Sequence, residues 1–183
     1  MRAAPCALIA TDPQQAERLA RDTSALTHGH VLGQEAAVAF ARILFEVLHG
    51  ATLERAVQCI ALSRPIMQAL DAAMILGPDL VERLGGGWVA EEALAIAVYA
   101  ARNARDVTHG LQIAVTHSGD SDSTGAMAGN LLGLMYPREV LRHHWRDDLE
   151  CRDVIDRIAR DLAAARETRE SFADEFFDRY PGW

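Results

Sequence analysis

The stretch VLGQEAAVAFARILFEVL, Val31 to Leu48, decides the fold class of this chain. Its strongly polar residues are confined to Gln34, Glu35, Arg42 and Glu46. A helix with so narrow a polar stripe is surrounded by other elements of its protein. The stretch therefore predicts a buried central helix, around which the rest of the chain packs.

Helical spacing continues on both sides of this stretch, and no alternating pattern predicts a strand. Thr11, Asp12 and Pro13 predict a helix start, because a capping side chain precedes a proline whose missing N–H costs nothing in the first turn. Further helices are predicted over residues 52–63, 65–76, 78–84, 90–104, 107–117, 123–135 and 137–147. The last segment predicts one or two amphipathic helices, with Val154, Ile155, Ile158 and Leu162 on one face and Phe172, Phe176 and Tyr180 on the next.

The predicted helices are joined by short loops rich in glycine, proline and serine. No linker, internal repeat or block of charge divides the 183 residues, a length that can bury one sizeable core. We therefore predict a single, compact, all-α domain over residues 1–183, with its chemistry at helix ends and short loops.

The charge of the chain limits its partners. The formal net charge is -8, which argues against nucleic acid, because such binding neutralises phosphates with Lys and Arg. A small ligand that carries phosphate stays open, since one local site can oppose the overall sign. The longest apolar runs, such as ALAIAVYAA from Ala93, are shorter than the roughly 20 residues of a membrane span. No signal peptide is expected at the start, so no membrane is expected as a partner.

The cysteines predict neither a disulfide framework nor a metal–thiolate motif. Cys6, Cys59 and Cys151 are far apart and lie in apolar or helical surroundings. We expect them to be buried small hydrophobic residues, as free cysteines commonly are. A reducing compartment agrees with this composition, and a cytoplasmic location is expected.

The stretch THSGDSDSTGAMAGNLLG, Thr116 to Gly133, predicts a candidate site for a hard cation. Asp120 and Asp122 lie on a loop among glycines and hydroxyls, and their carboxylates can converge on Mg²⁺, Mn²⁺ or Ca²⁺. Ser121 and Ser123 lie where a helix opens, and helix N-termini favour anions such as phosphate. The alternative is that one aspartate caps the helix and the other is solvated, which needs no metal.

The helix after the aspartates carries Gly125, Gly129 and Gly133 at every fourth position. A glycine inside a helix costs about 1 kcal/mol relative to alanine, so a repeated glycine needs a reason. We expect another backbone to approach this face closely and so to hold the aspartate loop rigidly.

Other residues have two interpretations each. Gly85, Gly86, Gly87 and Trp88 offer close backbone approach and an aromatic face, which suits a wall for adenine or ribose; the alternative is a flexible turn with the tryptophan packed on the bundle. His117 either orients a carboxylate or is a satisfied interhelical histidine, which we favour. His30 is expected to be structural, and Glu91 and Glu92 open a helix and favour its dipole.

Four stretches together resemble the ADP-ribosylglycohydrolase family. THSGDSDSTGAMAGNLLG is similar to the C-terminal signature of that family, and MRAAPCAL, ALTHGH and GGGWVAEEALAIAVYAA agree with it in the same order. The resemblance runs from Met1 to about Tyr136, and the combination is far more specific than any one stretch.

The resemblance implies an orthogonal all-α bundle that holds two adjacent Mg²⁺ or Mn²⁺ ions in a cleft for ADP-ribose. It implies that Asp120, Asp122 and Ser123 are metal ligands. His28 matches a family position near the bound ADP-ribose, and its alternative role is to cap carbonyls at a helix end. Gly86, Gly87, Trp88 and Ser121 are the other residues expected to bind substrate. The family cleaves the bond between the anomeric carbon of ADP-ribose and a protein side chain or small leaving group.

The sequence also departs from the family pattern. The Thr-Asp-Asp-Thr stretch that supplies other metal ligands, and a glutamate near the N-terminus, have no counterpart here. The chain is thus expected to correspond to the C-terminal half to two-thirds of the family domain. It is a fragment, a chain begun at an internal methionine, or a natural half whose second chain supplies the rest.

Two functional hypotheses follow. The first is a metal-dependent hydrolase that removes ADP-ribose from a protein side chain or small adduct, and that is inactive as this isolated chain because most of the metal shell would be water. The catalytic residues are unknown. The second is a module that binds ADP-ribose or another protein without catalysis. The partner is ADP-ribose or an ADP-ribosylated protein in the first case, with a second protein chain as a further candidate.

Overall fold

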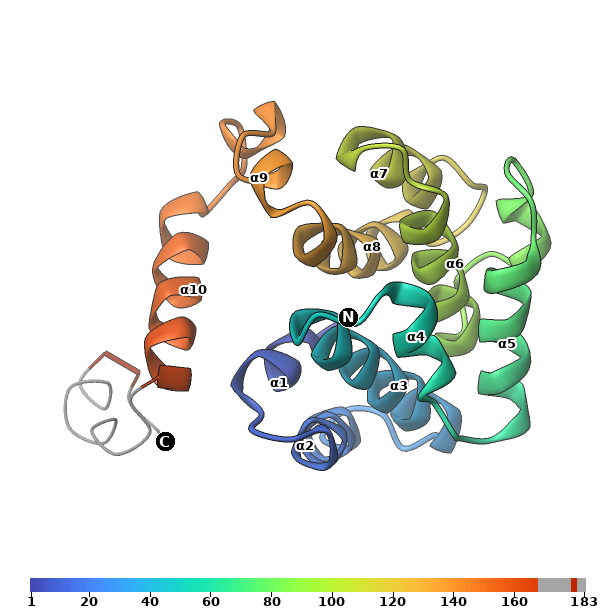
Figure 1. The fold of residues 1–183 in the computed structure, drawn as a ribbon, viewed down its shortest axis with the longest axis horizontal. Coiled ribbons are helices and arrows are strands. Elements are labelled where there is room, and N and C mark those ends of the chain that lie inside the picture. The colour runs from blue at the N-terminus through green and yellow to red at the C-terminus, as the bar shows by residue number, and fades with distance from the viewer. Residues whose placement is uncertain (168–178, 181–183) are drawn as a thin grey trace.

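The computed structural model describes residues 1–167 and residues 179 and 180, and all regular structure in these residues is helical (Figure 1). The α-helices are α1 (Ala4–Ile9), α2 (Pro13–Ala25), α3 (Val31–Leu48), α4 (Leu53–Gln58), α5 (Arg64–Ile75), α6 (Ala90–Asn103), α7 (Val107–Val115), α8 (Ser121–Met135), α9 (Pro137–Val140) and α10 (Arg152–Glu167). Two 3₁₀ turns, η1 (Val81–Leu84) and η2 (His144–Arg146), lie in the connections. The predicted all-α class is confirmed.

Helix α3 is the centre of the bundle, as its sequence predicts. It contacts α1, α2, α4, α5, α6 and α8, and Figure 1 shows it surrounded by helices. The bounds of α3 agree with the predicted stretch, and the ring of His30 accepts a hydrogen bond from the N–H of Leu32 at its start. His30 is therefore structural, as expected.

The polar stripe of α3 has a packing role. Arg42 donates to Glu17 of α2 at 2.6 Å and to Glu46 of its own helix at 2.7 Å. Asp12 caps α2 by accepting from the N–H of Gln15 at 2.7 Å, which confirms the predicted helix start.

Helix α6 forms the second half of the core. Every residue from Ala93 to Ala101 is buried, and α6 packs against α3, α5, α7 and α8. The small side chains of this alanine-rich run let four helices approach at once. Tyr99 carries the one polar group in the run, and its hydroxyl donates to Gly77 O at 2.7 Å and accepts from Leu80 N at 3.0 Å.

Three predicted helices are shorter than expected. Residues 52–63 form a helix only to Gln58, and residues 78–84 form only η1, because Asp79 adopts a φ of 61°. Residues 137–147 break into α9 and η2. Helix α9 ends at Val140, and η2 begins after His143, whose backbone is extended and whose ring Nε2 lies 2.9 Å from the hydroxyl of Thr108.

The expectation that all three cysteines are buried is wrong for two of them. Cys6 is buried beneath α2, with its sulfur 3.7 Å from the hydroxyl of Thr23. Cys59 and Cys151 are exposed because they lie at a helix end and in a loop. All three are free thiols.

Helices α1 to α8 form the compact part of the fold, and α10 stands to one side (Figure 1). It contacts α1 and buries none of its residues. Val154 and Leu162 are half-buried on the predicted apolar face, whereas Ile155 and Ile158 are exposed. Phe172 and Phe176 lie outside the described residues, and Tyr180 donates to Asp161 at 2.7 Å. No helix in the described part is both long and apolar enough to cross a bilayer.

Candidate functional site

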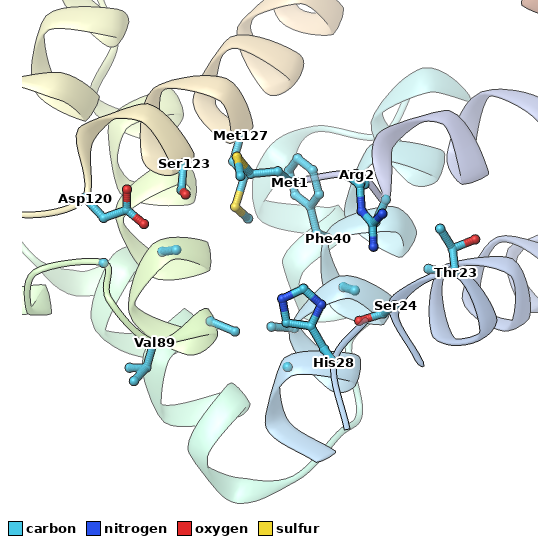
Figure 2. A pocket seen from close by; sticks show the side chains of 18 of the residues that line it. Met1, Arg2, Thr23, Ser24, His28, Phe40, Val89, Asp120, Ser123 and Met127 are labelled. Carbon is cyan, nitrogen blue, oxygen red and sulfur yellow. The ribbon is translucent and has the colours of Figure 1, made fainter. Parts of the chain in front are cut away.

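A cleft of about 330 Å³ opens between the start of α1, the loop from α2 to α3, the loop before α6, and the start of α8. Figure 2 shows Asp120 and Ser123 on one side, Arg2, Ser24 and His28 on the other, and Phe40 and Met127 between them. Asp120 and Ser123 thus form an acidic wall, which faces a basic wall that contains Arg2 and His28. The apolar side chains of Phe40 and Met127 lie between the two walls. The size is within the range of small-ligand pockets.

The acidic wall contains the aspartates of the candidate metal site. Asp120 precedes α8 and Asp122 lies in its first turn, and their carboxyl groups are within hydrogen-bonding reach of each other. Asp120 and Ser123 line the cleft, whereas Asp122 is exposed beside them. The hydroxyl of Ser123 donates to Asp122 at 3.2 Å. The three predicted ligands therefore lie together at one helix N-terminus.

The pKa of Asp120 is lowered, first by hydrogen bonding with the Asp122 carboxyl and then by hydrogen bonding with Ser123. Asp120 is therefore ionised at neutral pH. A hydrogen bond between two carboxyl groups holds one shared proton, and a bound cation would take the place of that proton. Asp120 occupies the N-cap position of α8, and the N–H of Ser123 in the first turn also helps to lower its pKa, as a helix cap would.

The backbone around Asp120 is fixed by contact with the loop before α6. The N–H of Asp120 donates to Gly86 O at 2.7 Å. A Cβ on Gly119 would lie 1.8 Å from the same oxygen, so only glycine fits there. A Cβ on Gly87 would lie 2.9 Å from the methyl carbon of Thr124, and the φ of Gly87 is +74°.

Two acidic side chains that sequence reasoning did not assign hold these loops. Glu92 accepts from the N–H groups of Gly86 and Gly87, both at 3.1 Å. Glu82 accepts from the N–H of Ser118 at 3.0 Å and from its hydroxyl at 2.8 Å. The hydrogen bonds to Glu92 therefore fix the backbone of the Gly85–Gly87 loop. Glu92 is not among the residues that line the cleft.

His117 and Thr124 are the buried polar residues beneath the acidic wall. The ring Nδ1 of His117 accepts from Gly119 N at 3.1 Å, which leaves Nε2–H to donate to the Thr124 hydroxyl at 2.9 Å. That hydroxyl lies 2.7 Å from Ala114 O and 2.9 Å from Asp120 O. His117 is therefore the satisfied interhelical histidine that we favoured.

The basic wall contains His28 and Arg2. Figure 2 shows the imidazole of His28 directed into the cleft, so it does not cap carbonyls at the end of α2. Its Nδ1 lies 2.7 Å from the hydroxyl of Thr27, which also accepts from the Arg2 guanidinium. Sequence reasoning did not assign Arg2, Phe40 or Met127; the position of Arg2 within the stretch MRAAPCAL was the available signal.

The remaining predicted substrate residues divide into two groups. Gly87 and Trp88 line the cleft, and Trp88 is 74% exposed, so it is not packed on the bundle. Gly86 and Ser121 do not line the cleft. Gly86 supports the indole of Trp88 and the backbone of Gly119, and the hydroxyl of Ser121 lies 3.4 Å from Gly119 O.

The expected role of the glycine-faced helix is wrong. A Cβ on Gly125 would meet a Val115 methyl at 2.7 Å, one on Gly129 would lie 3.8 Å from a Leu111 methyl, and one on Gly133 would meet nothing within 4 Å. These neighbours are side chains, so no backbone approaches this face closely. The close backbone approach that positions the aspartates occurs instead between Gly119 and Gly86.

The described residues form an all-helical fold with a cleft of small-ligand size at its helix ends. The sequence model of the family described as ADP-ribosylglycohydrolase matches residues 1–172. The chain belongs to the ADP-ribosylglycohydrolase family. No curated protein matches it significantly.

A solved structure described as an ADP-ribosylglycohydrolase-related protein complex is similar to this fold. The TM-score is 0.70 at 26% sequence identity. The match covers 88% of this chain and 57% of the other, so this chain spans little more than half the length of the protein that it matches.

The family is typically metal-dependent, and the residues here fit part of a metal site. Carboxylate and hydroxyl oxygens are the donors that Mg²⁺ and Mn²⁺ take. In residues 1–167, 179 and 180, however, no group of three or more His, Cys, Asp or Glu side chains is placed to hold an ion. Asp120, Asp122 and Ser123 would therefore leave most of the shell to water, ligand or other protein groups.

Proposed function

We propose that this chain provides the ADP-ribose cleft of an ADP-ribosylglycohydrolase together with the Asp120–Asp122–Ser123 share of its metal site. Family membership and the cleft support this proposal. The single observation that carries it is the opposition of an acidic and a basic wall across one cleft (Figure 2).

ADP-ribose has chemical groups that match both walls. Its diphosphate is anionic, and Arg2 and His28 offer N–H donors on the basic wall. Trp88 presents an exposed aromatic face on which adenine or ribose can stack. The sugar hydroxyls can reach the acidic wall, where a bound divalent ion would act as a Lewis acid and template at the anomeric centre.

The chain's own residues bind and orient the ligand in this proposal. Asp120, whose lowered pKa keeps it ionised, is held rigidly by Gly86, so its position needs no rearrangement when ligand arrives. The reaction expected of the complete site is hydrolysis of the bond between ADP-ribose and a protein side chain or small adduct. The described residues contain only part of the metal shell, so we propose that this chain alone hydrolyses little or none of such a substrate.

The incomplete set of metal ligands also favours a second function. A module that binds ADP-ribose or an ADP-ribosylated protein without hydrolysis needs the cleft, Trp88 and the basic wall, but no complete metal site. A second protein chain that supplies further ligands would restore the first function. The related solved structure is described as a complex, which is consistent with a partner.

Isothermal titration calorimetry with ADP-ribose tests the cleft. We expect binding that weakens about tenfold in Arg2→Ala and in His28→Ala, as expected for a lost hydrogen bond to a charged group. Arg105→Ala, which removes an exposed arginine outside the cleft, is the matched control. The proposed function is wrong if the unmodified chain does not bind ADP-ribose.

An arginine-ADP-ribosylated peptide tests whether this chain alone is active. Release of ADP-ribose by the purified chain, with Mg²⁺ or Mn²⁺ present, would contradict the non-catalytic module and the proposed lack of activity. Binding of the peptide without release is the expected result.

A further inference from the structure

The carboxylate of Glu92 occupies a backbone anion site that the protein's own loop forms. Gly85 and Gly87 have φ angles of +99° and +74°, and the N–H groups of Gly86 and Gly87 both point to Oε2 of Glu92 at 3.1 Å. Successive N–H groups that converge in this way bind anions. Here the anion is a side chain of the next helix, in the first turn of α6, where the helix dipole favours negative charge.

The fit between Gly85 and Glu92 is tight. A Cβ on Gly85 would lie 2.3 Å from the carboxyl carbon of Glu92, so a side chain at Gly85 would displace the carboxylate. The glycine therefore has two reasons to be there: its positive φ and the space that Glu92 fills.

The loop that Glu92 holds connects to the acidic wall and to Trp88. Gly86 O accepts from the N–H of Asp120 at 2.7 Å, and Gly87 and Trp88 follow directly on the cleft wall. Moving the Gly86 peptide would shift the acceptor for Asp120 and the base of the Trp88 indole together. One carboxylate thus bears on both the acidic wall and Trp88.

We infer that Glu92 is a positioning residue that sets Asp120 and Trp88 relative to each other through the Gly86–Gly87 peptides. The inference rests on the proposed function for what Asp120 and Trp88 bind, but the geometry that it describes is that of the ligand-free protein. Glu92 acts through the loop and does not touch the ligand.

Three variants of Glu92 test this role. Glu92→Gln keeps an acceptor oxygen at the same reach, Glu92→Asp keeps the charge but shortens the side chain by one methylene, and Glu92→Ala removes both. Glu91→Ala is the matched control, because it removes a charge from the same turn of α6 and leaves the bonds to Gly86 and Gly87 in place. Glu92→Asp keeps the inference testable if Glu92→Ala does not fold.

Amide hydrogen exchange by NMR measures the positioning without ligand. We expect the amides of Gly86, Gly87 and Asp120 to exchange about tenfold faster or more in Glu92→Asp and Glu92→Ala, the order expected when the hydrogen bonds from Gly86 and Gly87 are lost. In a background with Trp145 and Trp183 replaced by Phe, the fluorescence anisotropy of Trp88 should fall in the same variants. Glu92→Gln should retain most of the protection and anisotropy.

The outcomes separate this inference from the proposed function. Unchanged exchange at Asp120 in Glu92→Asp, or equal effects of Glu91→Ala and Glu92→Ala, would overturn the role of Glu92. If exchange and anisotropy change as expected while the unmodified chain does not bind ADP-ribose, the role of Glu92 stands and the proposed function fails. If both hold, ADP-ribose affinity should fall about tenfold in Glu92→Asp and be restored in Glu92→Gln.

Discussion

The N–H of Asp120 donates to the carbonyl oxygen of Gly86 at 2.7 Å, which joins the loop before α8 to the loop before α6. Gly119 lies against the same peptide so closely that a Cβ would come within 1.8 Å of that oxygen. The candidate metal ligand is thus positioned by contact between two glycine backbones.

Gly119→Ala should separate these two loops. The added methyl cannot fit without backbone movement, because the atoms that it meets are backbone atoms of Gly86. We expect a loss of about 1–3 kcal/mol in the free energy of unfolding, as overpacking typically costs. Urea denaturation measures this change, and NMR should show loss of protection at the Asp120 amide.

Gly133→Ala is the matched control and has the opposite expected sign. A Cβ there meets nothing within 4 Å, and the residue lies inside α8. Alanine should stabilise the helix by about 1 kcal/mol. If Gly119→Ala were as harmless as Gly133→Ala, the contact between Gly119 and Gly86 would not position the loop.

Thr124→Val should expose the role of the buried hydroxyl beneath Asp120. Valine keeps the shape of the side chain but leaves Nε2–H of His117 without its acceptor. An unpaired buried donor costs about 1–3 kcal/mol. Chemical denaturation gives the loss in unfolding free energy, and ¹⁵N NMR of the imidazole should show faster exchange of the Nε2 proton.

Thr124→Ser provides the comparison, because serine keeps the hydroxyl and removes only the methyl that lies near Gly87. The Nε2 proton of His117 should stay protected in this variant. Equal exchange in the valine and serine variants would mean that the Thr124 hydroxyl does not fix the histidine tautomer.

Much of the fold could be predicted because helix starts and apolar faces are local features. The bounds of α3 follow from its apolar surface, and α2 begins where Asp12 and Pro13 predict. The prediction failed where tertiary contacts decide the backbone. The helix predicted from residue 137 ends at Val140, and His143 beyond it contacts Thr108 of another helix. Asp79 takes a positive φ before η1.

The candidate site was only partly predictable for the same reason. Asp120 and Asp122 are neighbours in sequence, so their proximity follows from their spacing. The hydrogen bond from Asp120 to Gly86 joins residues that are distant along the chain. The hydrogen bond from Gly86 to Glu92 depends on how the loop folds back onto α6. The glycine spacing of α8 predicted close contact with another backbone. That prediction was wrong, because spacing along one helix does not identify what packs against it.

Asp12 should give α2 a pH-dependent stability. Hydrogen bonding from the N–H of Gln15 is the largest cause that lowers the pKa of this carboxyl. A lowered folded-state pKa stabilises the protein above the unfolded value of 3.8 and loses this effect as the pH falls through the folded value. Asp12→Ala should therefore be less stable than the unmodified chain at pH 7, and the difference should shrink below about pH 4. Urea midpoints across this range measure it, with Asp12→Asn as a variant that caps without charge.

Asp120 should decide whether the acidic wall binds a divalent ion. Its carboxylate is ionised at neutral pH, because contact with Asp122 and Ser123 lowers its pKa, and its neighbour Asp122 adds a second oxygen donor. Calorimetric titration with Mg²⁺ or Mn²⁺ at pH 7 should show weak binding that disappears in Asp120→Ala. Asp148→Ala removes an exposed carboxylate elsewhere and should leave this binding unchanged. Binding that survives in Asp120→Ala would place the ion elsewhere and remove the metal assignment.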